Sequence, residues 1–193
     1  MSAETPQIEA GFPAYVRNLL IGSFLVALLP VLSLLGAMAF HNLYLLQFVH
    51  VITGGTWTGF DIFMGVILAR IMKAMDLPVR VEVAKRLTPA TFFILPSLSA
   101  TAITSGIYLA QQLGKFDLTS PWIIGAGVVV IILTLQGFGI FTPNGLRIFL
   151  ELAKKNPDIK KIASLNMINI RLAGSQAVFQ VIIILIMAHL AVY

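Results

Sequence analysis

Cysteine is absent from this chain of 193 residues. Its absence excludes disulfide bonds, thiolate metal sites and iron–sulfur clusters, all of which need the sulfur of cysteine. Charged residues are also scarce: Asp, Glu, Lys and Arg make up only 11% of the chain, whereas an average soluble domain has about a quarter. Any bound metal must therefore use histidine, methionine or oxygen ligands.

Apolar residues dominate instead. They make up 58% of the chain, and the mean hydropathy is +0.93. Five segments are long and apolar enough to cross a bilayer as helices, which takes roughly 20 residues each. The sequence therefore predicts an all-α polytopic membrane protein with five transmembrane helices, at about 18–39, 43–69, 90–112, 122–141 and 172–192.

Breaks that contain proline separate these segments. They lie at Pro78, Pro89, Pro121, Pro143 and Pro157. We expect residues 1–17 to form an N-terminal cytoplasmic tail, and residues 18–193 to form one helical domain, a four-helix core with an additional N-terminal helix. The first segment is longer than the core of a signal peptide, so we expect it to remain in the mature protein.

The basic residues fall on one side of this topology. Arg17 precedes the first segment, five Lys or Arg residues lie at 70–86 and six at 147–171, whereas the other side has only Lys115. The positive-inside rule therefore predicts a cytoplasmic N-terminus and an outside C-terminus. We expect the membrane to be the plasma membrane of a prokaryote. Because these cations flank membrane spans, we expect them to contact anionic lipid and not nucleic acid.

Two ionisable residues, His50 and Asp61, lie within the second segment. Ionisable groups are costly in hydrocarbon, so they are by default candidates for a functional site. At about 100° per residue, Gly54, Trp57 and Asp61 project within roughly 40° of His50. One face of this helix therefore holds an imidazole, a glycine, an indole and a carboxyl group.

Each residue of this face has a functional and a structural interpretation. His50 either ligates a metal or haem iron, or hydrogen-bonds a neighbouring helix. Gly54 leaves room for a flat cofactor or another backbone, and Trp57 either walls that cofactor or packs against a helix. Asp61 is either a proton relay or a structural carboxyl, ion-paired or protonated. We expect His41, in the preceding turn, to be solvated.

The fifth segment carries polar residues on two faces. Arg171 and His189 are about five full turns apart and share one side. Neither face suits lipid, so we expect this helix to be central in the bundle or shared with another subunit, of a homo-oligomer or a larger membrane complex. Nearly opposite Arg171 and His189 lie Asn166, Asn169, Gln176 and Gln180.

The rise along the two helices predicts which of these residues meet. His50 lies within about 5 Å of the level of His189, and Asp61 lies near the level of Gln176 and about 6 Å above Arg171. We expect an imidazole pair, with His189 as a second metal ligand, and a contact of Asp61 with Arg171 or Gln176. The alternatives are an interfacial His189 and an Arg171 that extends to the membrane surface.

The spacing His-x6-Trp-x-Gly at His50, Trp57 and Gly59 resembles a superfamily of membrane proteins. It includes the CopD copper-resistance proteins, the HemJ-type protoporphyrinogen oxidases and related predicted membrane proteins. The small-residue stretch at 96–110 is similar to the second core helix of these relatives. The resemblance covers the second to fifth segments and implies a four-helix core in which His50 binds haem, or copper in the CopD branch.

Differences from these relatives bear on the activity. The first arginine after Trp57 is Arg70, whereas the HemJ pattern has one sooner, and Asp61 has no counterpart in that branch. The chain also has no tail rich in Met or His for handling copper. The resemblance therefore implies binding of haem b more than it implies protoporphyrinogen oxidation or copper transport.

Three classes of function follow from these observations. We expect a redox protein that carries haem b in the bundle and exchanges electrons with a quinone or a partner protein. The first alternative is a metal transporter that uses His50 and Asp61, although the sequence shows no inverted repeat. The second alternative is a structural subunit of a larger membrane complex, consistent with loops too short for a soluble catalytic domain.

The predicted orientation can be tested with introduced cysteines. Because the chain has none of its own, a single cysteine placed at 73–86 or 154–161 is the only thiol. We expect a membrane-impermeant thiol reagent to leave both positions unlabelled in intact cells and to label Lys115→Cys. Labelling of the first two positions from outside the cell would overturn the orientation.

Overall fold

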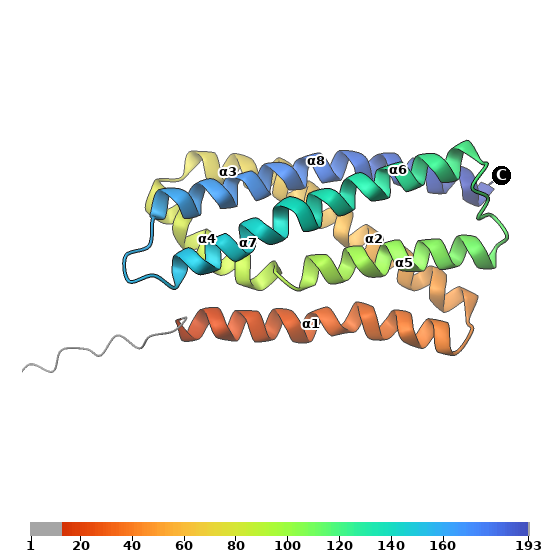
Figure 1. Ribbon diagram of the computed structural model, residues 1–193, viewed down its shortest axis with the longest axis horizontal. Helices are drawn as coiled ribbons and strands as arrows, with labels where there is room; N and C mark the ends of the chain where they lie inside the picture. Colours follow the sequence, from red (N-terminus) through yellow and green to blue (C-terminus); the bar gives the residue numbers. More distant parts are fainter. Residues whose placement is uncertain (1–12, 193) are drawn as a thin grey trace, which may run out of the picture.

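The computed structural model describes residues 13–192, which form helices joined by short turns, without a β-strand (Figure 1). The helices run along one long axis. Two of them, labelled η, are π-helical turns that continue an α-helix without a break. The elements are α1 (Ala14–Ala39), α2 (Leu43–Ile62), η1 (Phe63–Leu68), α3 (Ala69–Ala74), α4 (Leu77–Thr91), α5 (Ile94–Gln112), α6 (Pro121–Gln136), η2 (Gly137–Phe141), α7 (Thr142–Leu152) and α8 (Ile159–Val192).

The all-α class is confirmed, and four or five helical spans are long and apolar enough to cross a membrane. The helices extend further than predicted at several ends. α1 begins at Ala14, so 14–17 are helical and not part of a tail, while 1–12 lie outside the described residues. α8 begins at Ile159 and not near 172. An apolar window marks the part that crosses hydrocarbon, whereas backbone hydrogen bonds continue the helix into polar sequence.

The predicted break at Pro143 is wrong, because the helix continues through η2 into α7. In a regular α-helix, the proline ring would clash with the carbonyl of Gly139, four residues earlier. In the wider π-turn, the N–H of Thr142 instead reaches the carbonyl of Gly137. The hydroxyl of Thr142 also donates to that carbonyl, at 3.2 Å. The π-turn thus carries the helix past the proline.

The third predicted segment is a broken helix. α4 and α5 are bent by 41° where they meet, after Phe92, and not at Pro89, which lies inside α4. The cause is Pro96, which has no N–H to donate to the carbonyl of Phe92 and whose ring would clash with it. The break frees backbone groups that must find other partners in a membrane.

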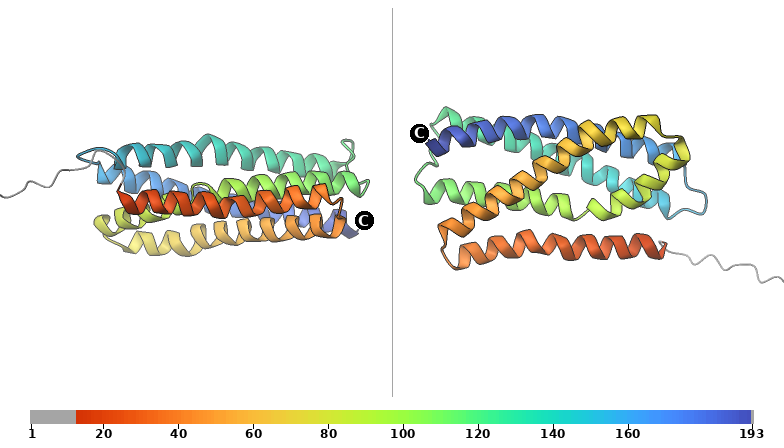
Figure 2. Two further views of the ribbon diagram at one scale, coloured as in Figure 1. Left: turned by 90° about the horizontal axis from the view of Figure 1, so that it is seen from below. Right: turned by 180° about the vertical axis from the view of Figure 1, so that it is seen from behind.

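α1 supplies partners at this break. The N–H of Phe93 donates to the hydroxyl of Ser23 at 3.1 Å, and the hydroxyl of Ser97 donates to the carbonyl of Ala27. Ser23 is buried, at 3% exposure. α1 packs against α4, α5 and α2 and lies along one side of the bundle (Figures 1 and 2). The N-terminal helix therefore covers the broken span.

The two basic turns share one end of the bundle. The turn after α3, the turn between α7 and α8, and residue 13 lie at that end, and the other two turns lie at the opposite end with the C-terminus (Figure 1). Lys154 and Lys161 both donate to the carboxylate of Glu151 at 2.9 Å and hold the α7–α8 turn. This arrangement agrees with the predicted pairing of turns, while the side that faces the cytoplasm stays a prediction.

α8 is the central helix, because it packs against α2, η1, α4, α6 and α7. Its contact with η1 is made backbone to backbone, at Gly65 and Gly174. A Cβ built on Gly65 would overlap the Cα of Gly174. Small residues allow this kind of close packing between membrane helices. The prediction of a central fifth segment is therefore confirmed, and its cause is this pair of glycines.

Adding one methyl group at the crossing tests this constraint. We expect Gly65→Ala to lower the midpoint of thermal unfolding in detergent, because the opposing atoms are backbone and overpacking costs about 1–3 kcal/mol or more. Gly59→Ala is the matched control, because a Cβ there meets nothing within 4 Å. It should be neutral or stabilise by about 0.5–1 kcal/mol. Equal midpoints for the two variants would contradict the role of the crossing.

Candidate functional site

The imidazole of His50 is held against α5. Its Nδ1 lies 2.9 Å from the carbonyl oxygen of Ala102 and 3.2 Å from the hydroxyl of Ser105. A carbonyl oxygen only accepts, so Nδ1 carries the proton of the neutral ring and Nε2 carries the lone pair. The ring fits because position 106 is glycine: an added Cβ would lie 2.7 Å from Cε1 of His50.

The next residues of the same face are packed by neighbouring helices. A Cβ on Gly54 would come within 3.9 Å of the Cβ of Ala102, so this glycine faces α5. Trp57 is 7% exposed and belongs to a buried cluster. Both residues thus pack against neighbouring helices, while their use as a cofactor wall stays a prediction. The cluster is formed by Trp57, Leu98, Ala102, Val129 and Leu133.

Asp61 is fully buried, at 1% exposure, and meets α8 at Gln180. The amide Nε2 of Gln180 donates to Oδ2 of the carboxyl at 2.8 Å. Within the described residues, Oδ1 of Asp61 and Oε1 of Gln180 have no hydrogen-bond partner. These are two acceptor oxygens on two side chains that are already in contact.

One proton satisfies both oxygens. A carboxylic acid and a primary amide form a paired arrangement in which the amide donates to one carboxyl oxygen and the other carboxyl oxygen, when protonated, donates to the amide oxygen. A charged carboxylate at this depth would leave both oxygens unpaired and a charge without a counter-ion. We therefore infer that Asp61 is a neutral acid paired with Gln180.

The expected contact of Asp61 with Arg171 or Gln176 is not formed. The Arg171 side chain is exposed, and the ion pairs of residues 13–192 are made by Glu82 and Glu151. Gln176 instead donates to the carbonyl of Leu133 at 3.3 Å. α2 crosses the bundle diagonally (Figure 2), which moves Asp61 toward the C-terminal half of α8.

The other two histidines lie apart from the Asp61 region. His189 stacks on Trp122 of α6, with ring centroids 3.8 Å apart, whereas His50 faces α5. The structure thus places these two imidazoles against different helices. His41 is exposed in the turn before α2 and has a positive φ of 49°. Among residues 13–192, no three His, Asp or Glu side chains gather as a metal cluster.

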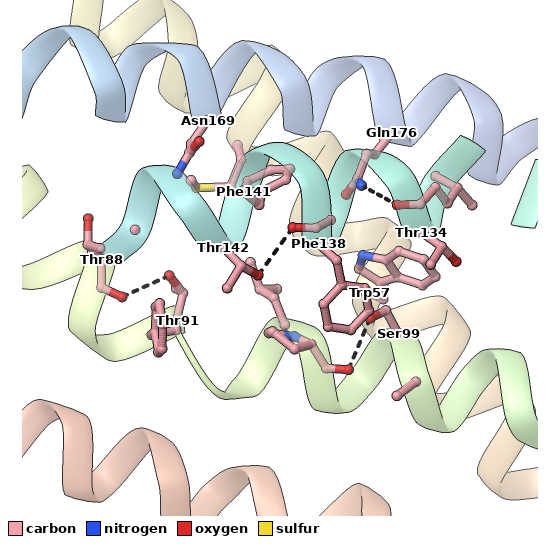
Figure 3. A pocket seen from close by; sticks show the side chains of 18 of the residues that line it. Trp57, Thr88, Thr91, Ser99, Thr134, Phe138, Phe141, Thr142, Asn169 and Gln176 are labelled. Carbon is pink, nitrogen blue, oxygen red and sulfur yellow. Dashed lines mark hydrogen bonds between the residues drawn. The ribbon is translucent and has the colours of Figure 1, made fainter. Parts of the chain in front are cut away.

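A cavity of about 110 Å³ lies beside these sites, between α5, α6–η2 and α8. Trp57 lines it, whereas His50, Asp61 and Gln180 do not. Figure 3 shows Asn169 and Gln176 reaching into it from α8. A larger engineered cavity of about 150 Å³ holds one benzene ring, so this cavity is too small to enclose a haem.

Sequence reasoning missed Gln180 as the partner of Asp61, and it missed the role of Gly106. Gln180 lies on the predicted polar face of the fifth segment. Its pairing with Asp61 depends on the diagonal path of α2, and counting residues along each helix does not include the angle at which two helices cross. Gly106 stands within the quoted small-residue stretch. The available signal was this glycine, because a histidine in one membrane helix needs space on a neighbouring helix.

Comparisons with models of known protein families, with curated proteins and with solved structures find no match to this chain. The resemblance to the CopD and HemJ-type proteins therefore rests on the residues quoted above. The function has to be argued from the site itself.

The acid–amide pair predicts the effects of two substitutions at position 61. Asp61→Asn should keep the stability of the parent, because its amide can both accept from and donate to Gln180. Asp61→Leu should cost about 1–3 kcal/mol, because it strands the buried Gln180 amide. Thermal unfolding in detergent at neutral pH measures both.

The double variant Asp61→Leu with Gln180→Leu is the matched control. Replacing both partners by apolar groups can be nearly neutral, so it should recover most of the loss seen with Asp61→Leu alone. If Asp61→Asn were as damaging as Asp61→Leu, the carboxyl would be charged in the folded protein and the neutral pair would be wrong.

Proposed function

We propose that this chain is an integral membrane haem-b-binding redox protein in which His50 ligates the iron. The observation that carries the proposal is the hydrogen bond between Nδ1 of His50 and the carbonyl of Ala102, at 2.9 Å. Histidines that ligate metals nearly always donate their other N–H to a carbonyl, a carboxylate or water. The ring is thus in the tautomer that a ligand needs, with its position fixed.

The surroundings of His50 fit one axial ligand. Ser105 supports Nδ1 from the same helix, and its own hydroxyl is placed by the carbonyl of Thr101, at 2.6 Å. Gly106 gives the ring its space. His50 is only partly buried, and it does not line the cavity beside Trp57. The proposal therefore assigns the iron to His50 alone and separates the haem from that cavity.

Haem b, when bound, supplies a one-electron couple whose potential depends on its axial ligand and surroundings. The chain's own contribution is to bind and to hold a proton. His50 would hold the iron through Nε2, and the Ala102 carbonyl would make that nitrogen a stronger donor. Asp61 holds a proton deep in the bundle, paired with Gln180. These roles support electron exchange with a partner in the bilayer.

The copper-transport alternative has less support. Copper and zinc sites need several His, Cys, Met or carboxylate ligands in one place. No group of three or more His, Asp or Glu side chains is gathered within residues 13–192. We therefore favour the redox function over transport in this proposal.

The spectrum of the purified protein tests the proposal. We expect a Soret band after expression with sufficient haem, and its loss in His50→Gln. The amide of glutamine can still donate to the Ala102 carbonyl, so this variant keeps the helix contact and removes the imidazole ligand. The thermal midpoint without haem should change little, which separates ligation from folding.

His41→Asn is the control for His50→Gln. Position 41 has a positive φ, and asparagine tolerates that conformation better than most residues. We expect its Soret band to match that of the parent. A parent protein without pigment, or a His50→Gln variant with an unchanged spectrum, would remove haem from the proposal.

A further inference from the structure

The cavity beside Trp57 opens toward the surrounding lipid. α5 packs against α1 and α2, whereas α6 packs against α8, so the cavity lies where α5 and α6–η2 are held apart. Phe138 lines it and is 60% exposed, and Thr134 beside it is also exposed. These two residues mark the mouth. A molecule dissolved in the bilayer reaches the cavity sideways, without passing through water.

The floor of the cavity is polar. The floor is lined from α8 by Asn166, Asn169 and Gln176. These residues are spread over about 15 Å of the helix, since an α-helix rises 1.5 Å per residue. Asn169 accepts from Asn144 at 3.0 Å, and Gln176 donates to the carbonyl of Leu133. Asn166 is different: it is 3% exposed, and its Nδ2 has no partner within the described residues.

An unpaired buried donor costs about 1–3 kcal/mol. Such a group in a folded protein calls for an explanation, and an absent ligand is one. Asn166 lines the cavity, so a ligand that places an acceptor oxygen beside its amide would satisfy this N–H. This requirement favours a carbonyl or ether oxygen over a cation.

The remaining lining selects a neutral, flat ligand. Of the described residues that line the cavity, none carries a charge. Aromatic rings from three parts of the fold line it, at Trp57, Phe92, Phe138 and Phe141. Figure 3 shows Trp57, Phe138 and Phe141 among them. Aromatic walls favour a planar ring. The enclosed volume of about 110 Å³ takes the polar edge of a single ring, and the rest of the ligand lies in the mouth.

We propose that this cavity binds the head group of a lipid-soluble quinone, with a quinone carbonyl accepting from Nδ2 of Asn166. A benzoquinone is neutral, planar and an acceptor only, and its apolar chain stays in the bilayer. As an electron partner the quinone rests on the redox function proposed above. Binding itself involves neither His50 nor haem.

The two tryptophans make binding measurable. Trp57 lines the cavity, whereas Trp122 stacks on His189 elsewhere. Trp122→Phe leaves Trp57 as the single fluorophore, and Trp57→Phe leaves Trp122. Decylubiquinone, a benzoquinone with a decyl chain, quenches indole fluorescence at close range. We expect saturable quenching of Trp57, and for Trp122 only the linear quenching caused by probe dissolved in the detergent micelle.

Asn166→Leu, made in the Trp122→Phe background, tests the hydrogen bond. We expect the probe to bind about three- to tenfold more weakly, as the loss of one neutral hydrogen bond predicts. The variant should be at least as heat-stable as its parent without quinone, because it removes an unpaired donor. Asn18→Leu, an exposed site on α1 outside the cavity, is the matched control and should bind as the parent does.

Each outcome decides the proposal. Saturable quenching of Trp57 that Asn166→Leu weakens and Asn18→Leu does not would support it. Linear quenching of both tryptophans, or saturable quenching that Asn166→Leu leaves unchanged, would overturn it. His50→Gln in the same background separates the two proposals: loss of the Soret band with retained quenching is expected. A protein without haem that still binds decylubiquinone would leave this inference standing alone.

Discussion

Gly65 and Gly174 let η1 and α8 meet backbone to backbone, and much of the molecule follows from that contact. α8 packs against α2, η1, α4, α6 and α7 because it lies deep among them. The crossing fixes where the residues before Gly65 meet those after Gly174. Asp61 lies four residues before the first glycine and Gln180 six after the second, and these two side chains pair. The polar core is thus positioned by residues that have no side chain.

A second constraint is that hydrocarbon offers no hydrogen bonds. The fold supplies partners for several of the polar groups that it buries. Ser23 accepts from the N–H freed by the bend between α4 and α5, Ala102 accepts from His50, and Gln180 donates to Asp61. Within residues 13–192, the buried side-chain atoms that stay unpaired belong to Asp61, Gln136, Asn166 and Gln180. Unpaired polar atoms in such a setting mark where a proton or a ligand acts.

The sequence predicted the helical class and the apolar spans because both depend on composition over windows of about twenty residues. It placed Asp61 against the polar face of the last helix. The helix was predicted correctly, but the partner on it is Gln180 and not Gln176 or Arg171. A count along each axis gives depth, whereas crossing angle and tilt decide the register. The same count could not place His50 against α5, because spacing within one helix does not name the neighbouring helix.

Helix ends and breaks were harder to predict, for a local reason. Proline removes one helix hydrogen bond and crowds the preceding turn, yet Pro30 and Pro89 lie inside α1 and α4. At Pro143 the hydrogen-bond pattern changes and the helix runs on through η2, while at Pro96 it does not and the helix bends three residues earlier. Both segments contain the same residue type, so the difference lies in what surrounds it. Glycine at 137 and 139 and a threonine hydroxyl support the π-turn.

The cover that α1 provides over the bend at Phe93 has a consequence for synthesis of the chain. α1 leaves the ribosome before α4 and α5. The Ser23 hydroxyl and the Ala27 carbonyl are therefore already present when the broken span follows. Docking onto an earlier helix, and not lipid, then pairs the polar groups at the bend. The order of the helices along the gene is therefore part of how this protein reaches the bilayer interior.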